Sequence, residues 1–174
     1  MISLIVPAHD EEAVIGRLLQ GLTVSGASEE LEILVICNGC SDRTAAVARG
    51  FGAPVRVIES DVASKAHALR LGDAAARFFP RFYVDADVQL DLESVRRVAA
   101  ALESGSCLAA APRMRVDLSG APWAVRAYYR IWLRLPYHRE GMIGSGVYAL
   151  SERGRARFGE FPDIISDDGT ASPM

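Results

Sequence analysis

The order of hydrophobic and amphipathic stretches limits the fold of this chain more than any other feature. Residues 2–6 form a hydrophobic run, and residues 11–22 follow with apolar side chains at helical spacing. The same order then recurs, with hydrophobic runs at 31–37, 55–58 and 82–84 and helical patterns at 41–51, 64–79 and 92–102. Because parallel strands need crossover connections, this order predicts an α/β fold: a mostly parallel sheet with helices on both faces, in three layers.

The pattern changes after residue 112. In a predicted helix at 123–135, Arg126, Arg130 and Arg134 are four residues apart and share one face, beside several aromatic residues. A basic, aromatic helix is typical of peripheral contact with an anionic membrane. The alternative is a solvated arginine stripe on a helix whose other face packs in the core. Further along the chain, the pattern predicts a loop at 141–146, a strand at 147–150 and a helix at 152–158.

Length and composition favour one globular domain over residues 1–174, since 50% of the residues are hydrophobic and 24% are charged. The formal net charge of −3 argues against binding to nucleic acid, which needs a basic surface. No uncharged apolar run approaches the roughly 18 residues that cross a bilayer, and the basic start of a secretory signal is missing. We therefore expect a cytoplasmic location, extending to the inner face of the membrane through the arginine helix, and three reduced cysteines.

Polar residues follow each of the first four predicted strands, at 7–12, 38–42, 59–65 and 85–87. In open α/β sheets, ligands bind beyond the carboxyl ends of the strands, so these four groups are expected to open on one edge. In the last group, Asp85 and Asp87 place two carboxylates close together, an arrangement that is costly unless a cation or hydrogen bonds offset the repulsion. Oxygen ligands of this kind suit Mg²⁺ or Mn²⁺ shared with a phosphorylated substrate, and a solvated turn or helix cap is the alternative.

In the order of its motifs, the chain resembles the family 2 glycosyltransferases. The resemblance is carried by VPAHDEE at 6–12, NGCSD at 38–42, Ser64-Lys65 with Ala68-Leu69, VDAD at 84–87, GSG at 144–146 and Asp167-Asp168. It implies the GT-A fold and the transfer of a sugar from a UDP- or GDP-sugar to an acceptor hydroxyl, with inversion at the anomeric carbon. The acceptor is left open between a lipid-linked molecule and a saccharide, and the chain is expected to lack the family's C-terminal extension.

On the donor side, the resemblance implies that the first loop and Asn38 hold the base and ribose, with contacts from Pro7, Ala8 and Glu11. Lys65 is then expected to lie near the donor. The chain departs from the family's pattern at His9-Asp10, where Asn or Tyr-Asn is frequent, and at Cys37-Asn38, where Asp-Asp is frequent. His9, His67 and His138 show no metal-ligand spacing and are interpreted as structural or surface residues.

For the chemistry, the resemblance implies that Asp87 coordinates Mg²⁺ or Mn²⁺ on the diphosphate and that Asp85 binds the ribose or supports the metal. A divalent cation neutralises the charge that builds up on the leaving nucleoside diphosphate. Within the acid pair Asp167-Asp168, Asp168 is the expected base, because an acceptor hydroxyl is a weak nucleophile until a carboxylate takes its proton. Gly144, Ser145 and Gly146 are expected on the acceptor side, with a flexible turn as the alternative.

Two other classes of function remain open. Cys37 and Cys40 form a C-x-x-C at a strand-to-helix junction, the position of a thioredoxin-like redox pair or of a partial metal site. Asp85-Ala86-Asp87 also resembles, more weakly, the motif of aspartate-nucleophile phosphatases. Alternatively, the chain is a donor-binding module without turnover, because it ends six residues after Asp168.

Overall fold

The computed structural model describes residues 1–23, 27–113, 115–132, 146–157, 159 and 161. Its centre is a six-stranded sheet with the order β3-β2-β1-β4-β6-β5. The four strands nearest the start of the chain are parallel to one another, while β6 is antiparallel to both of its neighbours. The strands are β1 (Ile2–Ala8), β2 (Leu31–Asn38), β3 (Val55–Ser60), β4 (Arg81–Val84), β5 (Ala109–Ala110) and β6 (Val147–Leu150). The predicted α/β fold with a mostly parallel sheet is confirmed.

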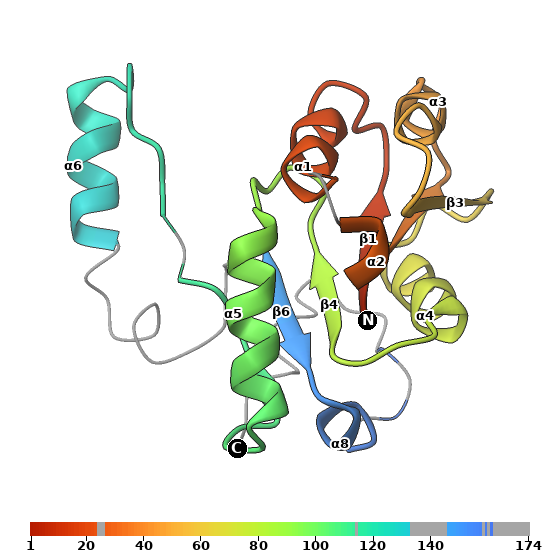
Figure 1. The fold of residues 1–174 in the computed structure, drawn as a ribbon. Helices are drawn as coiled ribbons and strands as arrows, with labels where there is room; N and C mark the ends of the chain where they lie inside the picture. Colours follow the sequence, from red (N-terminus) through yellow and green to blue (C-terminus); the bar gives the residue numbers. More distant parts are fainter. Residues whose placement is uncertain (24–26, 114, 133–145, 158, 160, 162–174) are drawn as a thin grey trace.

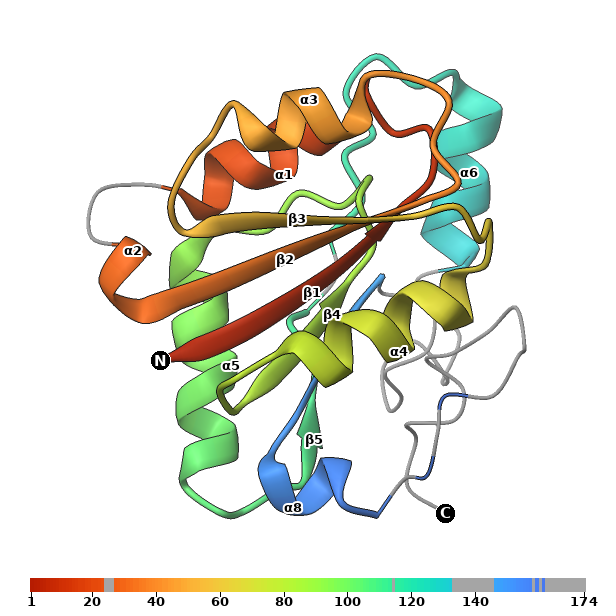
Figure 2. The ribbon, with the colours of Figure 1, turned by 90° about the vertical axis from the view of Figure 1, so that its right-hand side faces the viewer.

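Helices cover both faces of this sheet (Figures 1 and 2). One core cluster joins α1 (Ile15–Leu22), α3 (Thr44–Arg49) and α5 (Leu92–Glu103) to one face. A second cluster joins α4 (Lys65–Ala75) to the other face. Every residue of β1 and β2 is buried, which explains why the two strands read as continuous hydrophobic runs instead of an alternation. The three-layer arrangement follows from these two apolar faces.

Several predicted boundaries were wrong by a few residues. The first helix begins at Ile15 and not at residue 11, and the backbone N–H of Glu11 donates to Thr44 Oγ1. The second begins at Thr44 and not at residue 41, and the N–H of Thr44 donates to Asp42 Oδ1 at 2.8 Å. The other helices run over α4 Lys65–Ala75, α5 Leu92–Glu103 and α8 Glu152–Arg155, and the short elements α2 (Ala27–Glu30) and β5 were not predicted.

A buried polar group at the amino end of the sheet connects α4, β4 and α8. The Asp73 carboxylate accepts hydrogen bonds from Tyr83 Oη at 2.7 Å, Arg81 Nη1 at 2.8 Å and Arg155 Nε at 2.9 Å. Burial alone would raise the pKa of Asp73, but the hydrogen bonds from Arg155, Tyr83 and Arg81 outweigh it and lower the pKa. We call Asp73, Tyr83, Arg81 and Arg155 the amino-end clamp, because it ties three elements to one charge.

The helix α6 (Trp123–Trp132) stands apart from the layered body (Figure 1). Trp123 is 82% exposed and Tyr128 is 60% exposed, and neither core cluster includes a described residue of α6. The described side chains therefore do not pack in the core, contrary to the alternative interpretation of this helix. Arg126 and Arg130 lie on α6, while Arg134 lies outside the described residues. Among the helices described, none combines the length and the apolar character needed to span a bilayer.

Candidate active site

A cavity of about 240 Å³ lies at the carboxyl ends of β1, β2 and β4, beside the start of α4. This is a topological switch point of the sheet, because β2 lies on one side of β1 and β4 lies on the other. Ligands of open α/β sheets bind in the crevice at such a switch point. Eight residues line the cavity: Pro7, His9, Glu11, Asn38, Lys65, Asp85, Ala86 and Asp87. All four predicted post-strand groups thus contribute to one site, and the group at 59–65 does so through Lys65.

The charged side of this cavity is formed by Lys65 and the loop after β4. Lys65 is the first residue of α4, after the N-cap Ser64, whose side chain accepts from His67 N. Its Nζ lies 2.8 Å from Asp85 Oδ1, and both side chains are about two-fifths exposed. Asp87, two residues further on, is exposed. The site therefore offers one ammonium and two carboxylates to solvent and to a ligand.

Glu11 adds a third carboxylate. Burial is the largest cause that raises its pKa, followed by the negative charges of Asp87, Asp42 and Asp85. A carboxyl group whose pKa is raised by its neighbours lies in a negative potential, which a bound cation would relieve. Perturbed acids in a cleft are characteristic of functional sites. This electrostatic coupling joins the loop after β1 to the loop after β4.

The carboxylates Asp85 and Asp87 fit a cation that is shared with a ligand. Mg²⁺ is usually held by one or two carboxylates together with substrate phosphates and water, so two protein ligands suffice. Within the described part of the chain, the one group of three ligand atoms within 4.8 Å of one another is Asp10, Cys40 and Asp42. Its carboxylates already accept backbone N–H groups: Asp10 from Ser41 at 2.7 Å, and Asp42 from Glu12 at 3.0 Å. These two acids connect the loops after β1 and β2.

The loops after β1 and β2 also position two residues of different chemistry. His9 Nδ1 lies 2.7 Å from the backbone oxygen of Asn38. The Asn38 side chain is buried, and its amide nitrogen, in the orientation that satisfies both groups, donates to Ala8 O at 2.9 Å and Ile36 O at 3.3 Å. Asn38 is thus held mainly by the backbone of the sheet. His9, interpreted from the sequence as a structural or surface residue, is exposed and lines the cavity. Its place directly after a strand was the signal that could have put it there.

The remaining predicted site residues lie in other places. Ala8 is 2% exposed, and its side chain belongs to the core and not to the cavity lining. Gly146 has a φ of 66°, and a Cβ there would lie 2.6 Å from Val88 Cγ2 and 3.5 Å from Asp85 Oδ2. Its carbonyl oxygen accepts the N–H of Asp85 at 2.8 Å, so Gly146 supports the loop that carries the acids. Gly144, Ser145, Asp167 and Asp168 lie outside the described residues.

The cysteines do not have the properties of a redox pair. Cys37, Cys40 and Cys107 are free thiols in the structure. Burial, and then the neighbouring Cys40, raises the pKa of Cys37 to about 12. The Cys40 thiol donates to Ala8 O at 3.3 Å. Because the thiolate is the nucleophile in disulfide exchange, a buried thiol with a raised pKa is unsuited to it. Cys37 and Cys40 are packing residues of β2 and its loop.

Comparison with protein families identifies the chain. The model described as glycosyl transferase family 2 matches residues 3–150, and the chain belongs to this family. This confirms the resemblance drawn from the order of the motifs. A search of curated proteins found no match.

Solved structures of glycosyltransferases share the fold. The chain is similar to the mannosyltransferase PcManGT from Pyrobaculum calidifontis in complex with GDP-Man and Mn²⁺ (21% identity, TM-score 0.76, 98% of this chain and 50% of that one). It is similar to glucosyl-3-phosphoglycerate synthase from Mycobacterium tuberculosis in complex with Mn²⁺, UDP and glucosyl-3-phosphoglycerate (22% identity, TM-score 0.64, 88% of this chain and 57% of that one). It is also similar to S. aureus TarS 1–349 in complex with UDP-GlcNAc (19% identity, TM-score 0.57, 62% of this chain and 32% of that one). The chain thus spans between about a third and somewhat more than half of these proteins.

Proposed function

We propose that this chain binds a nucleoside-diphosphate sugar, UDP- or GDP-linked, and transfers the sugar to an acceptor hydroxyl with inversion. The observation that carries the proposal is the cavity at the switch point between β1 and β4, which gathers Glu11, Asp85, Asp87 and Lys65. Its volume of about 240 Å³ is below the roughly 300–1,000 Å³ typical of small-molecule sites, so it would take up part of the donor. Membership of the family supports the same reaction class.

Each side of the cavity has a distinct task in this proposal. Asp87, supported by Asp85, would hold Mg²⁺ or Mn²⁺, and such an ion supplies charge neutralisation on the departing diphosphate. Lys65, beside Asp85, contributes a further positive charge to the same end of the donor. Two of the similar structures, PcManGT and glucosyl-3-phosphoglycerate synthase, contain Mn²⁺ with GDP-Man and with UDP, which supports this choice of cofactor.

The assignments of the catalytic base and of the acceptor-binding residues are supported only by the sequence motifs. We propose that Asp168, the second acid of Asp167-Asp168, takes the proton of the acceptor hydroxyl, and that residues 144–146 lie near the acceptor. Asp168→Asn should leave donor affinity unchanged and lower turnover by about 10²- to 10⁴-fold, the usual cost of removing a general base. Turnover near that of the wild-type chain would place the base elsewhere. A chain that binds donor but transfers nothing to any tested acceptor would instead be the donor-binding module.

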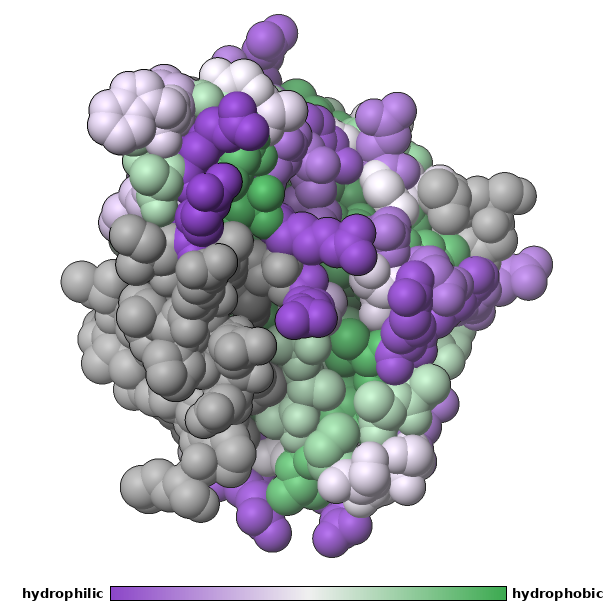
Figure 3. All heavy atoms as spheres, turned by 90° about the vertical axis from the view of Figure 1, so that its left-hand side faces the viewer, coloured by the Kyte–Doolittle hydropathy of each residue, from purple (hydrophilic) through white to green (hydrophobic). Residues whose placement is uncertain are grey.

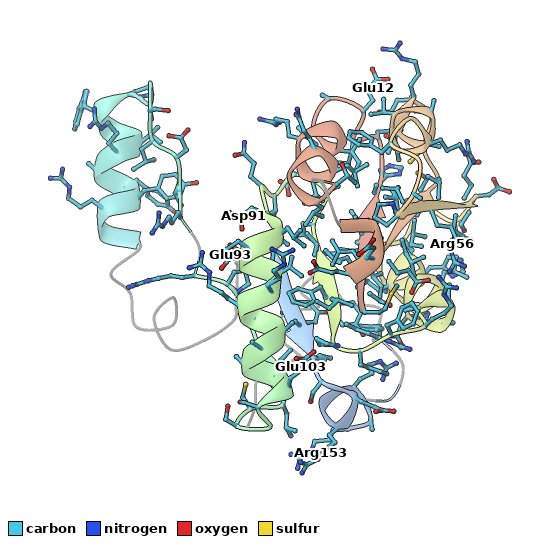
Figure 4. All side chains as sticks on the ribbon, in the orientation of Figure 1. Glu12, Arg56, Asp91, Glu93, Glu103 and Arg153 are labelled. Carbon is cyan, nitrogen blue, oxygen red and sulfur yellow. The ribbon has the colours of Figure 1, made fainter. Side chains whose placement is uncertain are left out.

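Calorimetry with UDP and GDP tests the donor site directly. In Mn²⁺, one of the two should bind the wild-type chain, and a chelator should remove most of that affinity. Asp87→Ala should abolish the metal-dependent part, whereas the control Glu103→Gln, on α5 and far from the cavity-lining loops (Figure 4), should bind as the wild type does. Equal affinity with and without the chelator would contradict the proposal.

We further propose that α6 contacts an anionic membrane surface, from the cytoplasmic side. The helix carries Arg126 and Arg130 and no acidic residue, and the exposed Trp123 and Tyr128 are of the type that sits at lipid interfaces. Figure 3 shows this side of the molecule, where strongly hydrophilic side chains lie next to side chains of intermediate hydropathy. The positive charges of Arg126 and Arg130 complement an anionic lipid headgroup, and a lipid-linked acceptor would lie in the same membrane.

Vesicle flotation tests this contact. The wild-type chain should bind vesicles of phosphatidylcholine with phosphatidylglycerol and should not bind phosphatidylcholine alone. Since each basic residue near such a surface contributes about 1 kcal/mol, Arg126→Glu with Arg130→Glu should weaken binding by roughly 30-fold or more. The matched control Arg153→Glu with Arg157→Glu, at α8, should not weaken it. Equal binding by both double variants would contradict the contact.

A further inference from the structure

Lys65 is paired with one of the two acids that are proposed to hold the cation. It is the one lysine of the chain, and its Nζ lies 2.8 Å from Asp85 Oδ1, in direct contact with that oxygen. A divalent cation at the same carboxylate would lie beside the ammonium, and like charges repel each other. Lys65 and the cation therefore compete for Asp85.

The backbone holds Asp85 in place in this competition. Its N–H donates to Gly146 O at 2.8 Å, and its carbonyl oxygen accepts the N–H of Val88 at 3.3 Å. A Cβ on Gly146 would lie 3.5 Å from Asp85 Oδ2, so this second carboxylate oxygen is close to the Gly146 backbone. The oxygen on the α4 side of the cavity is Oδ1, which Lys65 contacts.

The Lys65 side chain, in contrast, is suited to a change of partner. Its backbone belongs to the first turn of α4, after the N-cap Ser64, but its ammonium is attached to a flexible four-carbon stem. The side chains of Lys65 and Asp85 are each about two-fifths exposed, and exposed ion pairs contribute little because solvent competes for both charges. Exchanging Asp85 for another anion therefore costs little.

A diphosphate in the cavity would offer Lys65 such an anion. Lys65, Asp85 and Asp87 line the same cavity of about 240 Å³, so one ligand can reach the ammonium and both acids. Phosphate oxygens accept strong hydrogen bonds from an ammonium group. When Lys65 moves to a phosphate, Asp85 becomes available to the cation. Whichever ligand binds first breaks the ion pair, and the second does not have to, which is positive coupling between the two.

The charges around the cavity favour this exchange. Burial, and after it the negative charges of Asp87, Asp42 and Asp85, raise the pKa of Glu11, so the acids at this edge lie in a negative potential. One ammonium offsets one of these charges, whereas a divalent cation offsets two. With the cation among the carboxylates and the ammonium on the phosphate, both kinds of anion have a positive partner.

We propose that Lys65 is an exchangeable cation of the site: it pairs with Asp85 until a nucleoside diphosphate takes its ammonium, and it thereby makes binding of the divalent cation depend on binding of the nucleotide. The inference rests on the proposed function, since it takes the ligand to be a nucleoside diphosphate. It adds to the charge that Lys65 places near the donor a role in the order in which nucleotide and metal bind.

Titration with Mn²⁺ alone, followed by the paramagnetic resonance of the free ion, tests the competition. Lys65→Met removes the ammonium and keeps the length of the stem, so it should bind Mn²⁺ about 2- to 5-fold more tightly than the wild type. Lys65→Arg keeps the positive charge and should bind Mn²⁺ as the wild type does. Arg153→Gln removes one positive charge at α8, at the other end of the molecule (Figure 4), and should have no effect. Weaker or equal binding by Lys65→Met would overturn the inference.

Calorimetry with the nucleotide measures the coupling from the other side. The probe is whichever of UDP and GDP binds the wild-type chain more tightly, titrated with and without Mn²⁺. By linkage, the factor by which Mn²⁺ raises nucleotide affinity equals the factor by which the nucleotide raises Mn²⁺ affinity. Lys65→Met should lower this factor by about 2- to 5-fold, and Lys65→Arg and Arg153→Gln should leave it unchanged. An unchanged factor in Lys65→Met, even with weaker nucleotide binding, would overturn the inference.

A double variant separates the contact with Asp85 from a general effect of charge. In an Asp85→Asn background, Lys65 has no carboxylate to hold at this position, so adding Lys65→Met should no longer raise the affinity for Mn²⁺ alone. A rise of the same size in both backgrounds would show that the ammonium acts at a distance, and would overturn the exchange at Asp85. A wild-type chain that binds neither UDP nor GDP would overturn the proposed function itself, which is a separate outcome from the result with Mn²⁺ alone.

Discussion

Carboxylates at the two ends of the sheet have opposite surroundings. At the amino end, Asp73 is buried and accepts from Tyr83, Arg81 and Arg155, and its pKa is lowered. At the carboxyl end, burial, and after it the negative charges of Asp87, Asp42 and Asp85, raise the pKa of Glu11. The same chemical group is matched by cations in the first region and crowded by like charges in the second. The first arrangement stabilises the fold, and the second leaves a negative potential for a ligand and its cation to neutralise.

The largest effect is expected from Asp73→Ala in the amino-end clamp. The substitution leaves Arg81 and Arg155, whose side chains are 14% and 19% exposed, without their shared partner. Breaking a buried ion pair on one side costs about 3–5 kcal/mol, so the free energy of unfolding should fall by that amount in urea denaturation. Glu93→Ala is the control, because Glu93 pairs with Arg97 on the exposed surface of α5 and such pairs contribute about 0.3–0.5 kcal/mol. Equal losses of unfolding free energy in Asp73→Ala and Glu93→Ala would contradict the stabilising role of the amino-end clamp.

Asp87→Asn should weaken ligand binding and leave the free energy of unfolding almost unchanged, the reverse of what is expected for Asp73→Ala. It removes one charge-assisted contact, and such contacts contribute about 1.5–3 kcal/mol, so affinity for a nucleoside diphosphate with Mn²⁺ should fall by roughly 10- to 150-fold. Because Asp87 is exposed, the free energy of unfolding without metal should change by less than about 0.5 kcal/mol. A large loss of stability with unchanged affinity would assign Asp87 to the fold.

The smallest effect concerns pH. A group with a raised pKa in the folded state binds its proton more tightly there than in the unfolded chain, so stability falls as the pH rises through the range just above the ordinary value of a glutamate. Glu11→Gln should remove this fall and raise the melting temperature at neutral pH, without metal, by about 1–2 °C. Asp73 has the opposite sign, since its lowered pKa adds stability that is lost as the pH falls. Melting curves of the wild type and Glu11→Gln from pH 4 to pH 8 check the sign for Glu11. If the melting temperatures of the two proteins change in parallel with pH, the raised pKa of Glu11 is contradicted.

The sequence was sufficient for the sheet and for most of the cavity, because both depend on local pattern. Buried parallel strands produce continuous hydrophobic runs, and polar residues after them must meet at one edge, as Asp85, Asp87 and Lys65 do. The position of Ala8 in the core depends on which face of a fully buried strand each residue takes, and a continuous apolar run does not reveal this.

Hydrogen bonds between residues far apart in the chain could not be predicted from the sequence. The hydrogen bond that orients His9 could not be predicted from the sequence, because its partner is the carbonyl oxygen of Asn38, 29 residues away. The amino-end clamp joins Asp73 to Arg155, which are 82 residues apart, and no spacing rule connects them. The contacts between the loops after β1 and β2 are also long-range, such as the N–H of Glu12 that donates to Asp42, 30 residues away.

The central claim is that the ligand's divalent cation binds beside Asp85 and Asp87, and paramagnetic broadening by Mn²⁺ tests it most directly. In amide NMR spectra of the chain with UDP or GDP, a small amount of Mn²⁺ should first broaden the signals of residues 85–88 and of Glu11. Broadening that begins instead at Asp10, Ser41 and Asp42, and is the same without nucleotide, would contradict the account.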